Sequence, residues 1–120
     1  MSTLDITSVR FNADGLVPAI IQEQSTGDVL MLGYMNADSL GQTVATGRVV
    51  FWSRSRNELW RKGDTSGHIQ LVRELRLDCD NDTVLVQVEQ VGPACHNGTH
   101  TCFDDGLINA NTSVQIGDVK

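Results

Sequence analysis

Two segments in the middle of the chain alternate apolar and polar side chains, and they constrain the fold more than any other feature. Ile69–Leu77 places an apolar residue at almost every second position, and Thr83–Val91 does the same through Val84, Val86 and Val88. This period of two predicts β-strands that each bury one face. A polar, acidic corner separates the two segments. The chain is therefore expected to fold around a β-sheet.

Further strands are predicted in the first half of the chain. Leu16–Gln22 and Asp28–Tyr34 are short apolar runs. The polar stretch Gln24–Gly27 between them has turn chemistry, which predicts a β-hairpin. Arg48–Ser53 is rich in β-branched and aromatic residues, which favours another strand.

Two short helices are expected beside the strands. Ala37–Ala45 has apolar residues at helical spacing, follows an N-cap candidate at Asn36 and ends before Gly47. A capping-box pattern, S-x-x-E, begins at Ser55 and predicts a second helix over Arg56–Arg61. The expected fold class is α+β, mostly β, in a compact single domain with short helices.

Length and charge limit what the chain can do. Its 120 residues fit one domain, 1–120, with the informative motifs in about residues 16–103 and a polar tail at 107–120. A formal net charge of −6 argues against a general nucleic-acid binder, which needs a basic surface. No apolar run is long enough to span a membrane, and the start of the sequence lacks the order of a signal peptide. The expected location is therefore the reducing cytoplasm.

Four of the nine Lys and Arg residues fall within nine positions, at Arg54, Arg56, Arg61 and Lys62. Arginine presents a planar fork suited to phosphate oxygens, and a helix start at Ser55 would add free N–H groups. The turn that follows contains Thr65, Ser66 and Gly67, whose hydroxyls and backbone can approach an anion. The segment predicts phosphate binding, although a solvated charged face followed by a turn would give the same pattern.

Three aspartates alternate through the acidic corner, at Asp78, Asp80 and Asp82. On an extended segment alternate residues share one face, so the carboxylates would converge and repel one another unless a cation lies between them. Hard oxygen ligands suit Mg²⁺ or Ca²⁺. The spacing does not fit an EF-hand, because Thr83 stands where the sixth position requires glycine. A metal site and a plain acidic β-turn both stay open.

The chain has three cysteines, which cannot all pair with one another: Cys79, Cys95 and Cys102. His96 and His100 lie beside the last two. Thiolates and imidazoles are typical zinc ligands, and three cysteines with an open position would make a catalytic site. A histidine as fourth ligand would make a closed, structural site instead. Buried cysteines also serve as small apolar residues, but three of them near histidines and glycines favour zinc.

The chain contains, in order, LMLGYMN (30–36), FWSRSRNELWRKGDTSGHIQ (51–70), DCDND (78–82) and GPACHNGTHTCF (92–103). Together these stretches resemble the phosphoribosyl-AMP cyclohydrolase family of histidine biosynthesis. The resemblance implies hydrolysis of the N1–C6 bond in the adenine ring of 1-(5-phosphoribosyl)-AMP. It also implies an intertwined homodimer with one zinc ion per subunit and a requirement for Mg²⁺. Small departures from the family include Gly33 where alanine is usual and Asp64 where glutamate is common.

The resemblance also assigns roles to individual residues. The zinc ligands would be Cys79 of one subunit with Cys95 and Cys102 of the other. The magnesium ligands would be Asp78, Asp80 and Asp82. The segments WSRSR (52–56) and KGDTSG (62–67) would line the substrate site. Together with Arg61 of the basic segment, the expected contacts of the substrate and its two phosphates are Trp52, Ser53, Arg54, Ser55, Arg56, Arg61, Lys62, Thr65, Ser66 and Gly67.

A proton must reach N1 as the bond breaks, and two histidines are candidates to carry it. His96 is the first because it adjoins Cys95, and His68 is the second. His96 could instead hydrogen-bond near a zinc ligand and orient it. The rival function is a non-catalytic, zinc-stabilised module that binds a nucleotide or a protein. Its zinc would have four protein ligands, and it would leave the basic segment and the aspartates unexplained.

Overall fold

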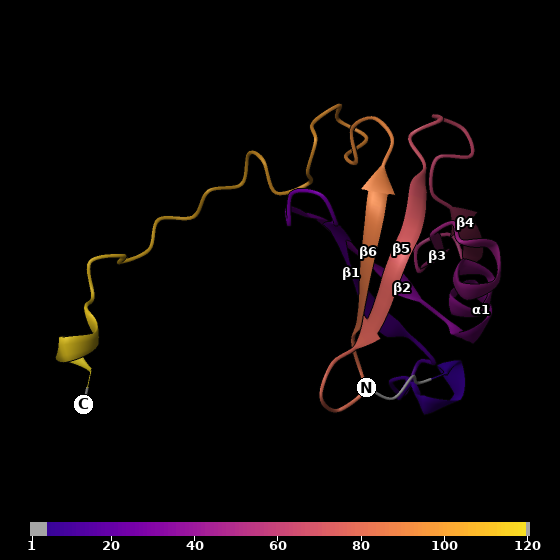
Figure 1. Ribbon diagram of the computed structural model, residues 1–120, viewed down its shortest axis with the longest axis horizontal. Helices are drawn as coiled ribbons and strands as arrows, with labels where there is room; N and C mark the ends of the chain where they lie inside the picture. Colours follow the sequence, from indigo (N-terminus) through magenta and orange to yellow (C-terminus); the bar gives the residue numbers. More distant parts are fainter. Residues whose placement is uncertain (1–4, 120) are drawn as a thin grey trace.

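The computed structural model describes residues 5–119 (Figure 1). Its strands are β1 Val17–Glu23, β2 Val29–Met35, β3 Val50–Ser53, β4 Glu58–Arg61, β5 Gln70–Leu77 and β6 Val84–Gln90. The α-helix α1 spans Ala37–Thr46, and two 3₁₀ turns, η1 and η2, span Ile6–Ser8 and Ile116–Asp118. The expected α+β, mostly β, fold is confirmed. Residues 1–4 and 120 of the expected domain lie outside the described part of the chain.

Four strands form the main sheet in the order β2-β1-β6-β5, and the other two form the hairpin β3-β4. β1 pairs antiparallel with β2, and β5 pairs antiparallel with β6. The central pair, β1 and β6, is parallel. Helix α1 and the β3–β4 hairpin lie together beside the sheet (Figure 1). Two hairpins that are distant in sequence are thus joined through the middle of one sheet.

The period of two sorts side chains between core and surface as the sequence predicts. Alternate residues of β1, from Val17 to Ile21, are buried, and so are alternate residues of β6, from Val84 to Val88. Phe51 of β3 joins the same core at 1% exposure. Each large apolar side chain buried in this way contributes about 1.5–3 kcal/mol. A one-residue slip would turn this whole row toward solvent, so the burial fixes the register.

The predicted helix over residues 37–45 is confirmed as α1, and its ends follow the expected chemistry. The Asn36 side chain accepts a hydrogen bond from the Ser39 N–H at 2.8 Å, and the Ser39 hydroxyl accepts one from the Asn36 N–H at 2.9 Å. Gly47 ends the helix in the left-handed region at φ 74°, where a side chain would be strained. Capping therefore sets both bounds of α1.

The helix expected over Arg56–Arg61 is wrong, because this segment contributes strand β4. Residues 54–57 form a turn in which Asn57 adopts φ 52°, a conformation that asparagine tolerates and a continuing helix does not allow. Trp60 then lies opposite Phe51 with ring centroids 5.4 Å apart. Contact with a core side chain outweighs the local capping-box pattern. The helix N-terminus expected to help bind phosphate is therefore absent from residues 54–61.

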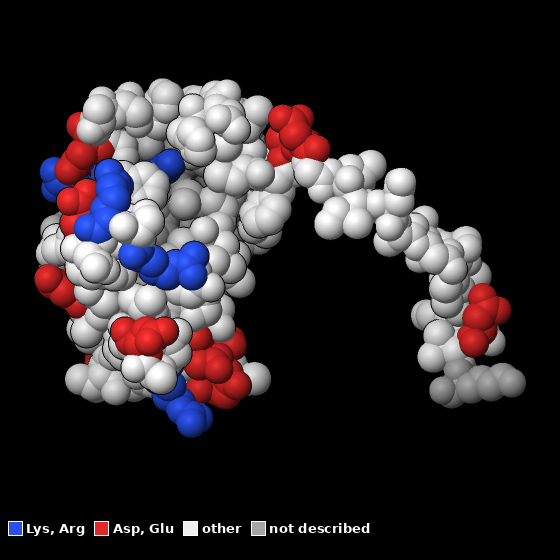
Figure 2. All heavy atoms as spheres, turned by 180° about the vertical axis from the view of Figure 1, so that it is seen from behind, with Lys and Arg blue, Asp and Glu red and all other residues white. Residues whose placement is uncertain are grey.

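Strand β6 separates two loops that carry most of the candidate site residues. The turn at 78–83 precedes β6, and the loop at 91–103 follows it, so the two lie at opposite ends of the sheet (Figure 1). Beyond this loop the chain leaves the body as an extended arm (Figures 1 and 2). Several apolar side chains of the arm are almost fully exposed, among them Leu107 and Ile116.

Candidate active site

The loop after β6 brings two of the three cysteines together. It folds back on itself through hydrogen bonds from the Ala94 N–H to the His100 carbonyl at 3.2 Å and from the Cys95 N–H to the Thr99 carbonyl at 3.1 Å. The thiols of Cys95 and Cys102 are within hydrogen-bond reach of each other. We call residues 94–102 the cysteine loop. It presents two thiol groups on one short segment that is closed by backbone hydrogen bonds.

The cysteine loop is fastened to the edge of the sheet at the start of β2. The Cys102 N–H donates to the Leu30 carbonyl at 2.8 Å, and the Thr101 hydroxyl donates to the Val29 carbonyl at 2.7 Å. Leu30 is fully buried, so this anchor is rigid. The position of the thiol pair is therefore set by the sheet and not by the loop alone.

The two thiols have opposite environments. A backbone hydrogen bond from Asn97 is the main cause that lowers the pKa of Cys95, whereas burial is the main cause that raises the pKa of Cys102. Cys95 is thus the thiol that ionises first, and its thiolate can accept a hydrogen bond from Cys102. Thiolates are the form that binds metal. This donor set fits zinc, although it supplies only two of the ligands that zinc requires.

Cys79 does not join the other cysteines within one chain. It is exposed in the turn that precedes β6, and the seven residues of that strand extend about 23 Å at roughly 3.3 Å each. In residues 5–119, two groups of at least three potential ligands gather closely enough for a metal ion, and neither contains a cysteine. Any zinc site that uses all three cysteines must therefore draw on more than one chain.

The three aspartates do converge, as the alternating pattern predicts. Oxygens of Asp78, Asp80 and Asp82 all lie within 4.8 Å of one another. The Asp78 carboxylate accepts hydrogen bonds from the backbone N–H groups of Asp82 at 3.0 Å and Thr83 at 3.2 Å. Asn81 turns the chain at φ 64°, which brings the carboxylates to one side. Three hard oxygen donors in this arrangement fit Mg²⁺.

Proton affinity is unequal within the aspartate group. Desolvation raises the pKa of Asp78, but the backbone hydrogen bonds outweigh it and leave the pKa below its usual range. A side-chain hydrogen bond with Asp82 raises the pKa of Asp80, helped by desolvation and by the charges of Asp78 and Asp82. Asp80 therefore retains a proton more readily than Asp78.

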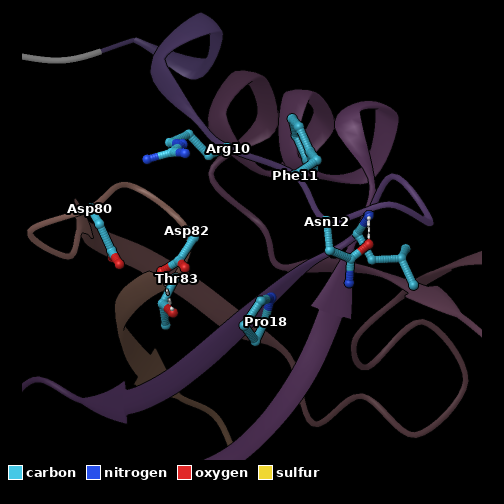
Figure 3. Close-up of a pocket in the computed structure, with 8 residues that line it drawn as sticks. Arg10, Phe11, Asn12, Pro18, Asp80, Asp82 and Thr83 are labelled. Atoms are coloured by element: carbon cyan, nitrogen blue, oxygen red, sulfur yellow. Dashed lines mark hydrogen bonds between the residues drawn. The ribbon is translucent and has the colours of Figure 1, made fainter.

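A pocket of about 420 Å³ opens beside these aspartates. Its lining includes Asp80, Asp82, Asn12 and Arg10, whose side chains are seen around it in Figure 3. The Arg10 N–H donates to the Asn81 carbonyl at 2.8 Å and so holds this arginine close to the acidic turn. Sequence reasoning did not single out Arg10, because no local pattern connects it to a turn about seventy residues away.

The exposed arginines of the basic segment have different partners. The Arg54 guanidinium lies 4.0 Å from the centre of the Tyr34 ring, a cation–π contact. Arg56 forms an ion pair with Glu58 at 3.4 Å. Among residues 5–119, no carboxylate lies within ion-pair distance of Arg54. Arg54 is thus the arginine of this segment that is most available to an anion.

The other cations of the segment turn away from Arg54. Arg61 forms a 2.7 Å ion pair with Asp64, which Arg48 also contacts at 3.3 Å. Lys62 is 7% exposed, and its Nζ donates to the Ala94 carbonyl at 2.6 Å. Burial lowers the pKa of Lys62, and the neighbouring thiols of Cys102 and Cys95 oppose that effect. The four cations that cluster in sequence therefore have separate partners in the structure.

The remaining predicted substrate residues lie on β3 and on two exposed turns. Trp52 and Ser53 end β3, and Ser55 lies in the turn with its hydroxyl 3.5 Å from that of Ser53. Thr65, Ser66 and Gly67 are exposed in the turn after β4, where the Gly67 N–H donates to the Gly63 carbonyl at 2.8 Å. Their contact with a substrate stays a prediction.

The three histidines occupy different positions around the cysteine loop. The His68 ring packs so closely on Gly92 that a Cβ there would lie 2.6 Å from His68 Cδ2. His96 is exposed at the turn of the loop. The His100 imidazole contacts the carboxylates of Glu23 at 3.1 Å and Asp28 at 3.4 Å, which joins the loop to the β1–β2 turn. His68 and His96 both stay candidates for proton transfer.

Comparison with known proteins identifies a family. The family model described as Phosphoribosyl-AMP cyclohydrolase matches residues 31–104, more than half of the chain. The chain belongs to the phosphoribosyl-AMP cyclohydrolase family. This match includes the aspartate group and the cysteine loop, whereas Arg10 lies outside it.

Three curated relatives carry the name phosphoribosyl-AMP cyclohydrolase. The relative from Nocardioides sp. is 56% identical over 112 residues, which cover 91% of each chain. The relative from Clavibacter sepedonicus is 68% identical over 99 residues, covering 82% of this chain and 72% of its own. The relative from Leifsonia xyli is 60% identical over 106 residues, covering 87% of this chain and 85% of its own. Membership in a cyclohydrolase family supports an enzyme over the non-catalytic zinc module. Among the described residues, no helix is both long and apolar enough to cross a membrane.

Proposed function

We propose that this chain hydrolyses the N1–C6 bond of 1-(5-phosphoribosyl)-AMP in histidine biosynthesis, and that it does so as a zinc- and magnesium-dependent homodimer in the cytoplasm. Family membership supports the reaction. One structural observation supports a homodimer. Cys95 and Cys102 lie together at one end of β6, while Cys79 lies with the aspartates at the other end. A ligand set divided in this way is complete only when two chains combine.

A two-fold symmetric dimer would bring the separated cysteines together. In a symmetric dimer the same surface of each subunit meets the other, so each Cys79 turn can face the partner's cysteine loop. Two equivalent sites result, with one zinc ion per subunit held by Cys79 of one chain and by Cys95 and Cys102 of the other. The aspartates adjoin Cys79 in sequence, so Mg²⁺ would be bound near the same site.

The reaction adds water to C6 and transfers a proton to N1 as the bond between these atoms breaks. Zinc, when bound, lowers the pKa of a coordinated water so that a nucleophile is available near neutral pH. The chain's own residues orient the substrate and move protons. Arg54 and Arg56 are exposed on one turn, where they can bind phosphate oxygens. His68 packs beside the cysteine loop and His96 lies on it, so either imidazole can carry a proton to the ring.

Complementation between two inactive variants tests the shared site. Cys79→Ser and Cys95→Ser each remove one ligand from both sites of a homodimer, so each variant alone should lose zinc and ring opening. In a mixed dimer one site loses both ligands while the other stays intact. After unfolding and refolding of an equal mixture, about half the dimers are mixed and about a quarter of all sites are complete.

The measurements are zinc content and the loss of adenine absorbance of phosphoribosyl-AMP. We expect about a quarter of wild-type activity from the refolded mixture and none when either variant is refolded alone. A mixture of Cys95→Ser with Cys102→Ser is the matched control, because both ligands come from the same chain and the mixed dimer still lacks one at each site. Equal recovery in both mixtures, or full activity in zinc-free protein, would refute the proposal.

A further inference from the structure

Lys62 is a buried cation that the reaction as proposed does not use. Lysine is almost never fully buried unless it is paired, yet Lys62 is only 7% exposed. Its ammonium donates to the Ala94 carbonyl at 2.6 Å and lies 5.3 Å from the centre of the Trp60 ring. Among residues 5–119, no carboxylate is within ion-pair distance of it. Another group must offset the buried charge.

The Lys62 ammonium contacts the cysteine loop directly. Ala94, whose carbonyl accepts the ammonium hydrogen bond, directly precedes Cys95. The thiols of Cys102 and Cys95 lie close enough to the Lys62 ammonium to interact with it electrostatically. The lysine is therefore held against the cysteine loop, one residue from Cys95.

The lysine backbone is also held firmly. The Lys62 N–H donates to the Val49 carbonyl at 3.0 Å, and the Lys62 carbonyl accepts from the Arg48 guanidinium at 3.3 Å. Val49 is fully buried, so the hairpin that carries Lys62 is fixed to the core. Trp60, on strand β4 just before Lys62, places its ring 5.3 Å from the ammonium. This geometry directs the charge at the cysteine loop.

We propose that Lys62 is a positioning residue for the zinc ligands and does not bind a substrate phosphate. It fixes the Ala94 carbonyl, and with it Cys95, and it supplies the positive charge that a thiolate-rich site lacks. Three thiolates around a dication leave one net negative charge, and one ammonium neutralises it. This inference rests on the zinc site of the proposed function, and it assigns to this site a protein cation that balances its charge.

Two substitutions separate charge from shape. Lys62→Met keeps the length and the apolar stem but removes the charge and the donor. Lys62→Arg keeps the charge but places a larger group in a buried space, which should cost stability. Arg73→Met is the matched control, because Arg73 is exposed, forms an ion pair with Glu89 at 2.9 Å and lies on β5 outside the cysteine loop.

Zinc affinity, measured by competition with a chromophoric chelator, is the first readout. Partners that support metal ligands typically change metal affinity about tenfold to a hundredfold when removed. We expect Lys62→Met to weaken zinc binding by at least about tenfold, Lys62→Arg to weaken it less, and Arg73→Met to match the wild type. The melting temperatures should rank differently: Lys62→Met at or above the wild type when zinc is absent, because a buried charge is removed, and Lys62→Arg below it.

Two further readouts exclude the other roles. In cobalt-substituted protein, the thiolate-to-metal absorption bands should shift in Lys62→Met and stay unchanged in Arg73→Met. The KM for phosphoribosyl-AMP should be unchanged in Lys62→Met while kcat falls. A raised KM with unchanged zinc affinity would assign Lys62 to phosphate binding and overturn the inference. If Lys62→Met lowers the melting temperature and zinc affinity falls with it, Lys62 would contribute to folding and not specifically to the zinc site. Wild-type protein that binds no zinc would instead overturn the proposed function, and the inference with it.

Discussion

Replacing Gly33 by alanine should destabilise the protein, because the added methyl group would clash with the buried Phe51 ring. Gly33 lies on β2 opposite Ala19, and a Cβ added there would be 2.5 Å from Phe51 Cδ1 and 2.6 Å from Cε1. Carbon atoms pack best at about 3.5–4.0 Å, so the ring must move by about 1 Å. Phe51 is 1% exposed and is flanked by Trp60, which leaves it little room. Overpacking of this kind costs about 1–3 kcal/mol.

Thermal unfolding followed by circular dichroism measures this cost. At roughly 4 °C for each kcal/mol in a domain of this size, the melting temperature should fall by about 4–12 °C. Gly41→Ala makes the same chemical change in α1, where the nearest atom to the new Cβ is Ile6 Cδ1 at 3.9 Å. That variant should gain about 0.5–1 kcal/mol, because alanine favours helix over glycine.

The two glycine variants must be compared at equal protein concentration and metal content, because binding and association raise apparent stability. Opposite shifts of the melting temperature support the packing described here. A Gly33→Ala protein as stable as the wild type would show that the Phe51 ring has free space. The close packing of β2 against β3 would then be wrong, whatever the outcome for Gly41.

Arg54→Ala should raise the KM for phosphoribosyl-AMP about tenfold or more without loss of zinc, because a hydrogen bond to a charged group contributes about 1.5–3 kcal/mol. Arg54 has no carboxylate partner within the described chain, so it is available to the substrate. An unchanged KM would remove Arg54 from the substrate site. Magnesium affinity should fall as the pH is lowered from neutrality to about 4, because the raised pKa of Asp80 lets a proton compete with the cation. Calorimetry in two buffers of different ionisation enthalpy should detect proton release in the wild type and less in Asp80→Asn. Affinity that is constant over this range would argue against metal binding by the aspartates.

Much of the fold was predictable because it follows from local patterns. Apolar alternation from Val84 to Val88 gave β6, and the caps at Asn36 and Gly47 gave α1. The aspartates also converged as their spacing predicts. The capping-box pattern at Ser55 failed because a contact between Trp60 and the core, which no local pattern contains, decides the structure of that segment.

The candidate site was predictable in its residue types but not in its grouping. Lys62 was grouped with the arginines next to it in sequence, yet its partner Ala94 is 32 residues away. Arg10 escaped notice for the same reason, since it contacts Asn81 across the fold. Tertiary contacts decide which cation pairs with which acceptor. Spacing along the chain cannot supply that information.

The parallel pairing of β1 with β6 also determines when the molecule can become complete. Gln22 and Gln87, which hydrogen-bond across this pair, are 65 residues apart in the chain. Closing such a loop costs on the order of 4 kcal/mol of chain entropy before its contacts form. During synthesis the β1–β2 hairpin leaves the ribosome long before its neighbour β6 exists. Its inner edge must stay unpaired until the last strand arrives, which makes this the interval in which the nascent chain is most exposed to misassociation.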